Sequence, residues 1–286
     1  MKKLVSLLLV VVMVLSMVAC GDKTANGDDK SKNQLVVATN ASFEPFEYMD
    51  GDTYYGVDME IAKLLADELG KELVIDNMDF NAVCLSVGQQ KCDIAMAGLT
   101  VNEKREKHVT FTESYYEASQ KLVVPSDDTV FANCTDVESV MTALNGLAKD
   151  VTIGVQEGTT GQFFVEGDEE WGFDGLTATC KTYKNGSLAI QDMINGNIDY
   201  VIIDAAPAVA ITESINAMQT DNAVTAKVLE YNLTEEEYAF GVDKTQPELL
   251  EQVNDFIKKI KEDGTLEEIF NKYFGDGTPE GVTSAK

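Results

Sequence analysis

The sequence is short of basic residues, and of arginine and histidine above all. Its 286 residues include 49 acidic and 22 basic residues, for a formal net charge of −27, and one histidine. Arg105 is the only arginine, and every other basic residue is a lysine. Such a chain is repelled by nucleic acid and by anionic lipid headgroups, so we expect no nucleic-acid partner.

The lone histidine also limits the chemistry that the chain can support. His108 lies near none of the cysteines in sequence, and the cysteine spacings do not suit zinc. One histidine leaves no Ser/His/Asp or Cys/His constellation for catalysis. We therefore expect no enzymatic activity, no metal and no other cofactor.

Long apolar runs are scarce, and the clearest one lies at the start of the chain. Lys2 and Lys3 precede an apolar run over 4–18 that ends in Ser-Met-Val-Ala-Cys-Gly. This run is shorter than the roughly 20 residues that span a bilayer, and its charged start and small-residue end are typical of an export signal. The ending resembles a bacterial lipobox, which implies a signal peptide over 1–19 and a lipidated Cys20. The alternative is a plain secreted protein with an incidental cysteine.

The stretch after Cys20 is polar over residues 20–33, which predicts a flexible tether. Four cysteines then remain. An even number outside the cytoplasm suggests disulfides, with Cys84–Cys92 and Cys134–Cys180 as the expected pairs. The alternative is four free, buried thiols.

Strand and helix patterns alternate along the chain, and the alternation starts twice. This order predicts two α/β lobes with a ligand cleft between them. The predicted strands cover 34–40, 72–78, 93–99, 119–125, 151–156, 177–184 and 200–204. The predicted helices cover 56–70, 81–90, 187–196, 205–216, 247–264 and 265–275.

The single arginine lies just beyond a predicted strand end. Asn102 can cap a short helix that begins at Glu103, which places Arg105 at the carboxyl edge of the sheet, where ligands bind. A guanidinium offers a planar fork of donors that matches a carboxylate. Arg105 is therefore a candidate carboxylate-binding residue, and the alternative is a surface ion pair with Glu103 or Glu106.

Seven motifs follow one another between about residue 34 and residue 275. They are ATNASFEPFEY (38–48), GVDMEIAKLLADELG (56–70), NMDFNAV (77–83), CDIAMAGLTVNEKREKHVTFTESYY (92–116), GVQEGTTGQ (154–162), NGNIDYVIIDAAPAV (195–209) and GTLEEIFNKYFG (264–275). In this order and spacing they resemble the family 3 bacterial solute-binding proteins, the polar amino-acid receptors of ABC importers.

The resemblance implies a two-lobed α/β fold of the type II periplasmic-binding kind. Each lobe would be a mainly parallel sheet flanked by helices, and two crossing strands would form the hinge. We expect lobe 1 to comprise 34–119 and 231–276, lobe 2 to comprise 120–230, and a C-terminal tail to follow over 277–286. The hinge candidates are the strands near 117–124 and 228–233.

The resemblance also implies how the ends of an amino acid would be held. Arg105 would bind the α-carboxylate, helped by the backbone N–H groups of Thr100 and Thr160. Thr159 and Thr160 belong to the Gly-Thr-Thr-Gly turn, whose amides can point at an anion. The alternative for this turn is an ordinary strand-to-helix connection.

Asp204 would bind the α-ammonium, together with the Gly98 carbonyl and the Thr100 hydroxyl. Asp204 ends a predicted strand, and the alternative is that it caps the helix that follows. The two roles are compatible.

The ligand's side chain would stack on Phe43 and Phe80, although an aromatic residue beside a strand is usually part of the core. Asn40 and Gln156 stand where the family reads the far end of that side chain. The glutamine receptors of the family have an aspartate and a lysine at these positions, and a histidine where this chain has Ile203, which argues against glutamine.

Neutral Asn40 and Gln156 favour a polar, uncharged or flexible side chain, whereas Glu44 and Glu47, which are close in sequence, admit a cationic one. The choice between a neutral polar amino acid, a cationic one and cystine stays open. We therefore expect a monomeric, lipid-anchored receptor outside the cytoplasm, on a Gram-positive surface rather than in a periplasm. It would bind a free polar amino acid and deliver it to an ABC transporter permease. The alternatives are a dehydratase-like enzyme of the same fold and a ligand-sensing lipoprotein.

Overall fold

The computed structural model describes residues 33–220, 223–275 and 277–285. Residues 34–286 form one compact unit. The expected signal peptide, the lipidated Cys20 and all of the tether except Asn33 lie outside the described residues. Within the described part of the chain, no helix combines the length and the apolar character needed to cross a bilayer.

The first lobe is built on a five-stranded mixed sheet. Strand β1 pairs in parallel with β5 and β6, and β15 then pairs antiparallel with both β6 and β7. The order across the sheet is β5 (Glu72–Asn77), β1 (Gln34–Thr39), β6 (Ile94–Ala95), β15 (Gly241–Asp243) and β7 (Val109–Phe111).

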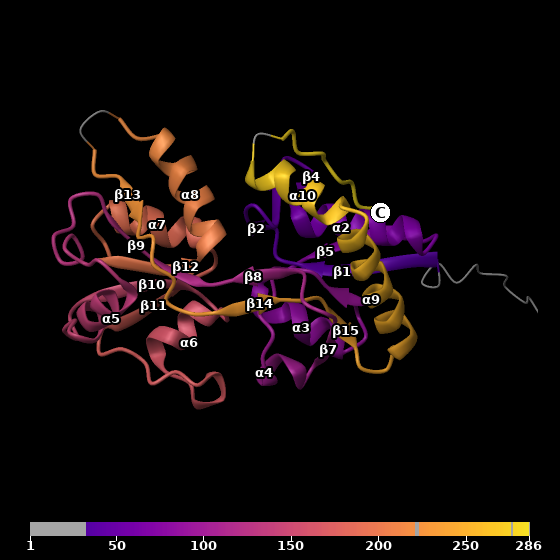
Figure 1. The fold of residues 1–286 in the computed structure, drawn as a ribbon, viewed down its shortest axis with the longest axis horizontal. Coiled ribbons are helices and arrows are strands. Elements are labelled where there is room, and N and C mark those ends of the chain that lie inside the picture. Colours follow the sequence, from indigo (N-terminus) through magenta and orange to yellow (C-terminus); the bar gives the residue numbers. More distant parts are fainter. Residues whose placement is uncertain (1–32, 221–222, 276, 286) are drawn as a thin grey trace, which may run out of the picture. The chain divides into compact units, whose positions relative to one another are not determined.

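Helices cover both faces of this sheet because alternate residues of β1 are apolar on both sides. Leu35 and Val37 pack into the cluster that includes α2 (Val57–Glu68), whereas Ala38 packs into the cluster that includes α3 (Phe80–Gly88). In Figure 1, α2 and α3 lie on opposite sides of β1.

Two further helices close the first lobe. In α9 (Pro247–Glu262), five apolar residues recur at helical spacing and are buried, whereas lysines occupy the last turn, where the helix dipole favours cations. The next helix, α10 (Thr265–Phe274), begins directly after Gly264 and packs on α9 and α2. Both helices lie where the sequence predicts them.

A small three-stranded meander also belongs to this lobe, and the sequence does not predict it. It is formed by β2 (Ser42–Phe43), β3 (Glu47–Asp50) and β4 (Thr53–Tyr55). The first residue of β3, Glu47, is completely buried. The meander therefore carries an acidic side chain into the interior of the lobe.

The second lobe repeats the layout of the first. Strand β10 pairs in parallel with β11 and β12, and β9 pairs antiparallel with β12 and β13. The order across the sheet is β11 (Thr179–Tyr183), β10 (Thr152–Gln156), β12 (Tyr200–Asp204), β9 (Gln120–Pro125) and β13 (Ala226–Val228).

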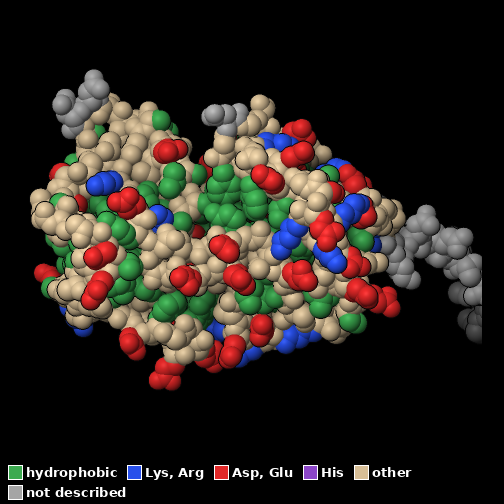
Figure 2. All heavy atoms as spheres, in the orientation of Figure 1, with side chains coloured by type: hydrophobic (Ala, Val, Ile, Leu, Met, Phe, Trp, Pro, Cys, Tyr) green, Lys and Arg blue, Asp and Glu red, His purple; other side chains and the backbone are tan. Residues whose placement is uncertain are grey.

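Helices again cover both faces of the sheet (Figure 1). Tyr200 and Ile202 of β12 pack with α5 (Val137–Asn145) and α6 (Thr160–Glu166), whereas alternate residues of the same strand pack with α7 (Gly186–Ile194) and α8 (Ala205–Ala217) on the other face. Each lobe therefore has one sheet with helices on both faces, which confirms the predicted two-lobed α/β fold. On the face drawn in Figure 2, acidic side chains are spread over both lobes.

The lobes are joined by β8 (Tyr116–Ala118) and β14 (Glu236–Tyr238), which pair antiparallel as a separate two-stranded sheet. The sequence predicts the second crossing strand near 228–233, and this position is wrong. Leu229 and Leu233 donate backbone hydrogen bonds to β9, so this segment still follows the second sheet. The expected lobe boundaries themselves stay a prediction.

The cysteine pairs are also corrected, because all four cysteines are free thiols in the structure. The Cys92 thiol lies 3.7 Å from Asp76 Oδ2 rather than bonded to Cys84. Cys134 and Cys180 both pack against the apolar cluster of the second lobe without forming a bond. All four thiols are free, as in the alternative, but only Cys84 and Cys92 are buried, whereas Cys134 and Cys180 are partly exposed.

Candidate functional site

Arg105 is held at the meeting point of the two lobes. It lies in the short helix α4 (Glu103–Glu106), and Asn102 Oδ1 accepts its backbone N–H at 2.8 Å, as expected of the cap. Its side chain is buried, and Nη1 donates to the Thr100 carbonyl at 2.7 Å while Nη2 donates to the Gly158 carbonyl, in the second lobe, at 3.2 Å. Burial lowers the pKa of the guanidinium. Arg105 therefore faces inward and not toward Glu103 or Glu106.

Two aromatic rings flank this guanidinium. Its central carbon lies 5.2 Å from the centre of the Phe80 ring and 5.3 Å from that of the Trp171 ring, within cation–π range. Trp171 ends the one-turn helix η2 (Glu169–Trp171) and stacks on Phe163. It is the only tryptophan in the chain, and nothing in its sequence context predicts a place beside Arg105.

The two threonines predicted at the carboxylate end meet across the lobes. The hydroxyl oxygens of Thr100 and Thr160 lie 3.2 Å apart, and each is 2.7 Å from Oε2 of Glu236 on β14. Thr159 is the residue before α6, and its hydroxyl donates to the Gln156 carbonyl at 2.8 Å. The Gly-Thr-Thr-Gly turn is thus a strand-to-helix turn that faces the first lobe. Glu236 was not predicted from the sequence.

Asp204 ends β12 and stands at the capping position of α8, but its side chain makes no capping bond. Its carboxylate instead accepts a short hydrogen bond from the Tyr238 hydroxyl. Burial and, after it, the charge of Glu236 raise the pKa of Asp204, hydrogen bonds from Tyr238 and Gln120 lower it, and the net result is a pKa of about 7. A cation that approached Asp204 would restore the charged form.

Gly98 and Phe43 fit together closely. Gly98 has a φ of +52°, and a Cβ atom there would lie 2.9 Å from the Phe43 ring. Its N–H donates to Asp58 Oδ2 at 3.0 Å. The glycine is therefore required both by its backbone conformation and by the ring that covers it.

Asn40 and Gln156 connect the two lobes through their amides. Asn40 Nδ2 donates to the Met78 carbonyl at 2.7 Å, so the Asn40 oxygen must be the atom that accepts from Gln156 Nε2 at 3.2 Å. The oxygen of Gln156 is then left over. It is buried and has no hydrogen-bond partner among the described residues. A buried acceptor thus stands where the two lobes meet, without a donor among the described residues.

Two further carboxyl groups lie buried in the first lobe: Asp58, which was not predicted, and Glu47, which the sequence offers as a carboxyl for a cationic ligand. Asp58 accepts from the Tyr115 hydroxyl at 2.6 Å and from Gly98, yet burial raises its pKa to about 7. Both oxygens of Glu47 lack a partner among the described residues. Burial, with the charges of Asp58 and Asp204, holds the pKa of Glu47 well above its usual range. The interior near the cleft is thus poor in positive charge.

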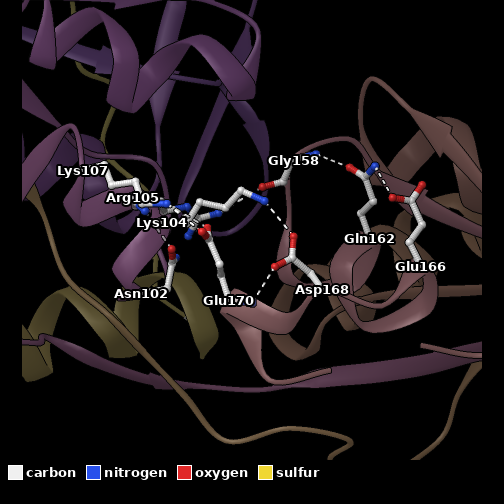
Figure 3. A network of polar contacts seen from close by, with 9 residues as sticks. All are labelled: Asn102, Lys104, Arg105, Lys107, Gly158, Gln162, Glu166, Asp168 and Glu170. Atoms are coloured by element: carbon white, nitrogen blue, oxygen red, sulfur yellow. Dashed lines mark hydrogen bonds and ion pairs between the residues drawn. The ribbon is translucent and has the colours of Figure 1, made fainter. Parts of the chain in front are cut away.

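Ion pairs bridge the lobes at the rim beside Arg105 (Figure 3). Lys104 Nζ lies 2.7 Å from Asp168 Oδ2, and Lys107 Nζ lies 2.8 Å from Glu170 Oε1. We call these two pairs the rim clasp. Lys104 also lies over the Phe163 ring, at 4.5 Å from its centre. Both lysines belong to α4 or follow it directly, so the helix that carries Arg105 also fastens the rim.

A cavity of about 1090 Å³ opens beside the two threonines. Of the predicted ligand residues, Thr100 and Thr160 line it, together with Trp171 and Glu236. Its lining contains several glutamates and no lysine or arginine. The space is ample for a small molecule and electrostatically suited to one that carries a positive group.

Two α/β lobes that present polar groups to a shared cleft, joined by two crossing strands, define a two-lobed ligand-binding protein. The chain belongs to the bacterial extracellular solute-binding proteins, family 3, whose family model matches residues 35–276. The resemblance seen in the motifs is therefore confirmed.

Individual relatives match over nearly their whole length. The chain is 29% identical over 279 residues to the arginine-binding extracellular protein ArtP of Bacillus subtilis strain 168, covering 96% of this chain and 98% of that protein. It is 26% identical over 276 residues to the probable histidine-binding protein of Neisseria gonorrhoeae, covering 95% and 94%. The solved ancestral amino acid-binding protein AncCDT-1, a precursor of cyclohexadienyl dehydratase, matches with a TM-score of 0.70 at 28% identity, covering 86% of this chain and 98% of that one.

Proposed function

We propose that this protein binds a free amino acid between its lobes and delivers it to an ABC importer permease, without chemical turnover. The observation that carries the proposal is a buried guanidinium on one lobe and a buried carboxyl on the other that are not paired with each other. Among the described residues, Arg105 hydrogen-bonds to two backbone carbonyls and forms no ion pair, whereas Asp204 is buried on the other lobe. A buried charge is costly unless it is paired. A zwitterion supplies both partners, its carboxylate to Arg105 and its ammonium to Asp204.

The side chain of the ligand would carry hydrogen-bond donors, with arginine first and histidine next. The unpartnered oxygen of Gln156 is an acceptor that a leucine-like side chain would leave unsatisfied. Glu44 follows Phe43 directly in the sequence and adds a half-buried carboxyl whose pKa is raised by burial. The two curated relatives described above, one arginine-binding and one probably histidine-binding, support the same class of ligand.

Closure follows from the distribution of these groups over two lobes. A ligand that touches Arg105 and Asp204 at once stabilises the closed state, and that difference in affinity drives the hinge. The strands β8 and β14 would carry the movement. The closed form would then dock on the permease as a monomer, held near the membrane by a lipid on Cys20.

The first experiment is a thermal-shift screen of the purified protein against the twenty amino acids, cystine and ornithine. A ligand that binds the folded state alone raises the melting temperature by mass action. We expect arginine or histidine to give the largest shift, and the shift to vanish in Arg105→Ala. If none of the amino acids shifts the melting temperature, amino-acid binding is contradicted. If the amino acid that binds is consumed during prolonged incubation, a role without turnover is contradicted.

The anchor has its own test. The wild-type protein expressed in a bacterium should be found in the membrane fraction and take up labelled fatty acid. Cys20→Ala should release it or leave its signal peptide uncut. Equal membrane association of the two forms contradicts lipidation at Cys20.

A further inference from the structure

The carboxylate of Glu236 collects donors from both lobes and from its own crossing segment. Its Oε2 accepts from the hydroxyls of Thr100 and Thr160, each at 2.7 Å. Its Oε1 accepts from Gln120 Nε2 at 3.0 Å and from the Thr234 hydroxyl at 2.6 Å. One side chain on β14 thus fixes polar groups on both sides of the cleft.

The threonine hydroxyls have a limited supply of protons. Each hydroxyl carries one proton and two lone pairs. A carboxylate oxygen at 2.7 Å is a stronger acceptor than the neighbouring hydroxyl at 3.2 Å, since charge-assisted hydrogen bonds are the stronger kind. The protons of Thr100 and Thr160 therefore point toward Glu236. What each hydroxyl has left for a ligand is a lone pair.

We propose that Glu236 is a positioning residue that turns the hydroxyls of Thr100 and Thr160 into acceptors and so reserves them for the ligand's α-ammonium. This inference rests on the proposed amino-acid binding and deepens it. The ligand carboxylate gains nothing from hydroxyls whose protons are engaged, so it is left to Arg105 and to backbone N–H groups. Asp204 and the two hydroxyls then form one acceptor surface for the ammonium.

Two residues next to Glu236 provide controls that distinguish this role from the general loss of one negative charge. Glu235 and Glu237 flank it in sequence and are exposed, whereas Glu236 is partly buried. Glu236→Gln removes the charge, and the amide nitrogen that replaces one oxygen is a donor rather than an acceptor. Glu235→Gln and Glu237→Gln make the same chemical change without touching either threonine.

The test compares two ligands that differ only in the α-ammonium. Calorimetric titration would measure the Kd of L-arginine and of 5-guanidinopentanoic acid, which is arginine without its α-amino group. If the screen identifies histidine instead, 3-(imidazol-4-yl)propanoic acid is the matched analogue. We expect Glu236→Gln to raise the Kd of the amino acid by about tenfold or more, which is the effect of losing one hydrogen bond to a charged group. The Kd of the analogue should change less than twofold. The two flanking residues also line the cavity, so their variants should change the affinities of both ligands to the same extent and leave the ratio of the two Kd values unchanged.

Equal losses for both ligands would overturn the inference, because they would mean that Glu236 only holds the lobes together. An unchanged ratio with no loss would overturn it as well. If wild-type protein binds no amino acid in the screen, the proposed function fails and the inference falls with it, a result distinct from either of these.

A second variant covers the case in which Glu236→Gln does not fold. Thr100→Val removes one of the hydroxyls with little change of volume, and it should show the same selective loss for the amino acid. Combining Thr100→Val with Glu236→Gln should cost less than the sum of the two, since both act on one contact. If Thr100→Val does not lose affinity for the amino acid selectively, that result alone contradicts the inference.

Discussion

The two lobes share one sheet layout but present different chemistry to the cleft. In each lobe three parallel strands are followed by an antiparallel strand that enters after a crossing, β15 in the first lobe and β9 in the second. The first lobe supplies the buried cation Arg105 and one of its aromatic neighbours, Phe80, whereas the other neighbour, Trp171, comes from the second lobe. The second supplies Asp204 and the Gly-Thr-Thr-Gly turn. The comparison shows that similar sheets can carry different groups, since the residues just beyond the strand ends give each side of the cleft its own charge.

The largest expected effect comes from removing the charge of the first lobe. Arg105→Ala would leave the ligand carboxylate buried without a partner, at a cost of about 3–5 kcal/mol, so we expect Kd to rise at least about a hundredfold. Isothermal titration with the amino acid found in the screen would measure this. The exposed Lys149→Ala serves as the control for loss of one positive charge. Binding within a few-fold of wild type would remove Arg105 from the site.

The second effect concerns the contact between the lobes. Gly158 has a φ of +79°, and a Cβ atom there would lie 1.7 Å from Asn81 Oδ1 of the first lobe. Gly158→Ala should therefore oppose closure and raise the Kd of the ligand by about tenfold or more, because of both the backbone strain and the clash with Asn81. Small-angle scattering with ligand should show a more open protein.

The control for this change is Gly196→Ala, at a φ of +73° with nothing within 4 Å of the added atom. It carries the same backbone strain without the contact between lobes. If both variants lose stability but keep wild-type affinity and closure, the approach of Gly158 to Asn81 does not limit closing.

The third effect is a pH dependence of opposite sign in the empty and the liganded protein. Burial raises the pKa of Asp58 and of Asp204 to about 7, whereas in the unfolded chain such groups titrate near 4. Between about pH 4 and 7 the folded protein keeps protons that the unfolded chain releases, so stability without ligand should fall as pH rises. Carboxylates with a lowered pKa, such as Asp192 at about 2, act below this window.

Ligand affinity should increase as pH rises, because the ammonium needs Asp204 in its charged form. Between pH 5.5 and 7.5 we expect the melting temperature of the empty protein to drop and Kd to fall about tenfold or more. Glu47 and Asp58 lie in the same interior, so Asp204→Asn and Asp58→Asn assign the effects separately. A melting temperature that rises over this range would show that these carboxyls do not control stability.

The smallest effect belongs to the rim clasp. Its pairs are partly exposed, and such pairs contribute about 0–1 kcal/mol, so Lys104→Glu should weaken binding by about five-fold or less and mainly at low salt. Asp168→Lys in the same chain should restore part of the loss. The exposed pair Lys63–Asp67, within one helix, is the matched control. Closure would be followed by Trp171 fluorescence. If changing the Lys63–Asp67 pair affects binding as much as changing the rim clasp, the rim clasp has no specific role in closure.

Much of the fold could be predicted from the sequence because its signals are local. Apolar periodicity and flanking glycines placed the helices near 57–68 and 247–262 within about two residues. The meander over 42–55 was missed because its strands are only two to four residues long. The second crossing strand was misplaced because the segment before it is equally extended and remains paired with β9.

The site was predictable where a residue type was unusual. A single arginine after a strand end pointed to the cleft, and Asn102 capped its helix as expected. The importance of Trp171 and Glu236 could not be predicted, because each meets its partners only after the lobes come together. Glu236 in particular is one of three consecutive glutamates, and only the strand register of β14 turns it inward.

The position of β15 also has a consequence for the order in which the protein can be made. This strand, at residues 241–243, lies between β6 and β7 of the first sheet. The first sheet therefore cannot be completed until almost the whole chain has left the ribosome, although most of its strands are made early. The second sheet, by contrast, comes from one continuous stretch that ends at β13. A growing chain therefore holds the early strands of the first sheet, within residues 34–111, without their central partner β15 until late in synthesis.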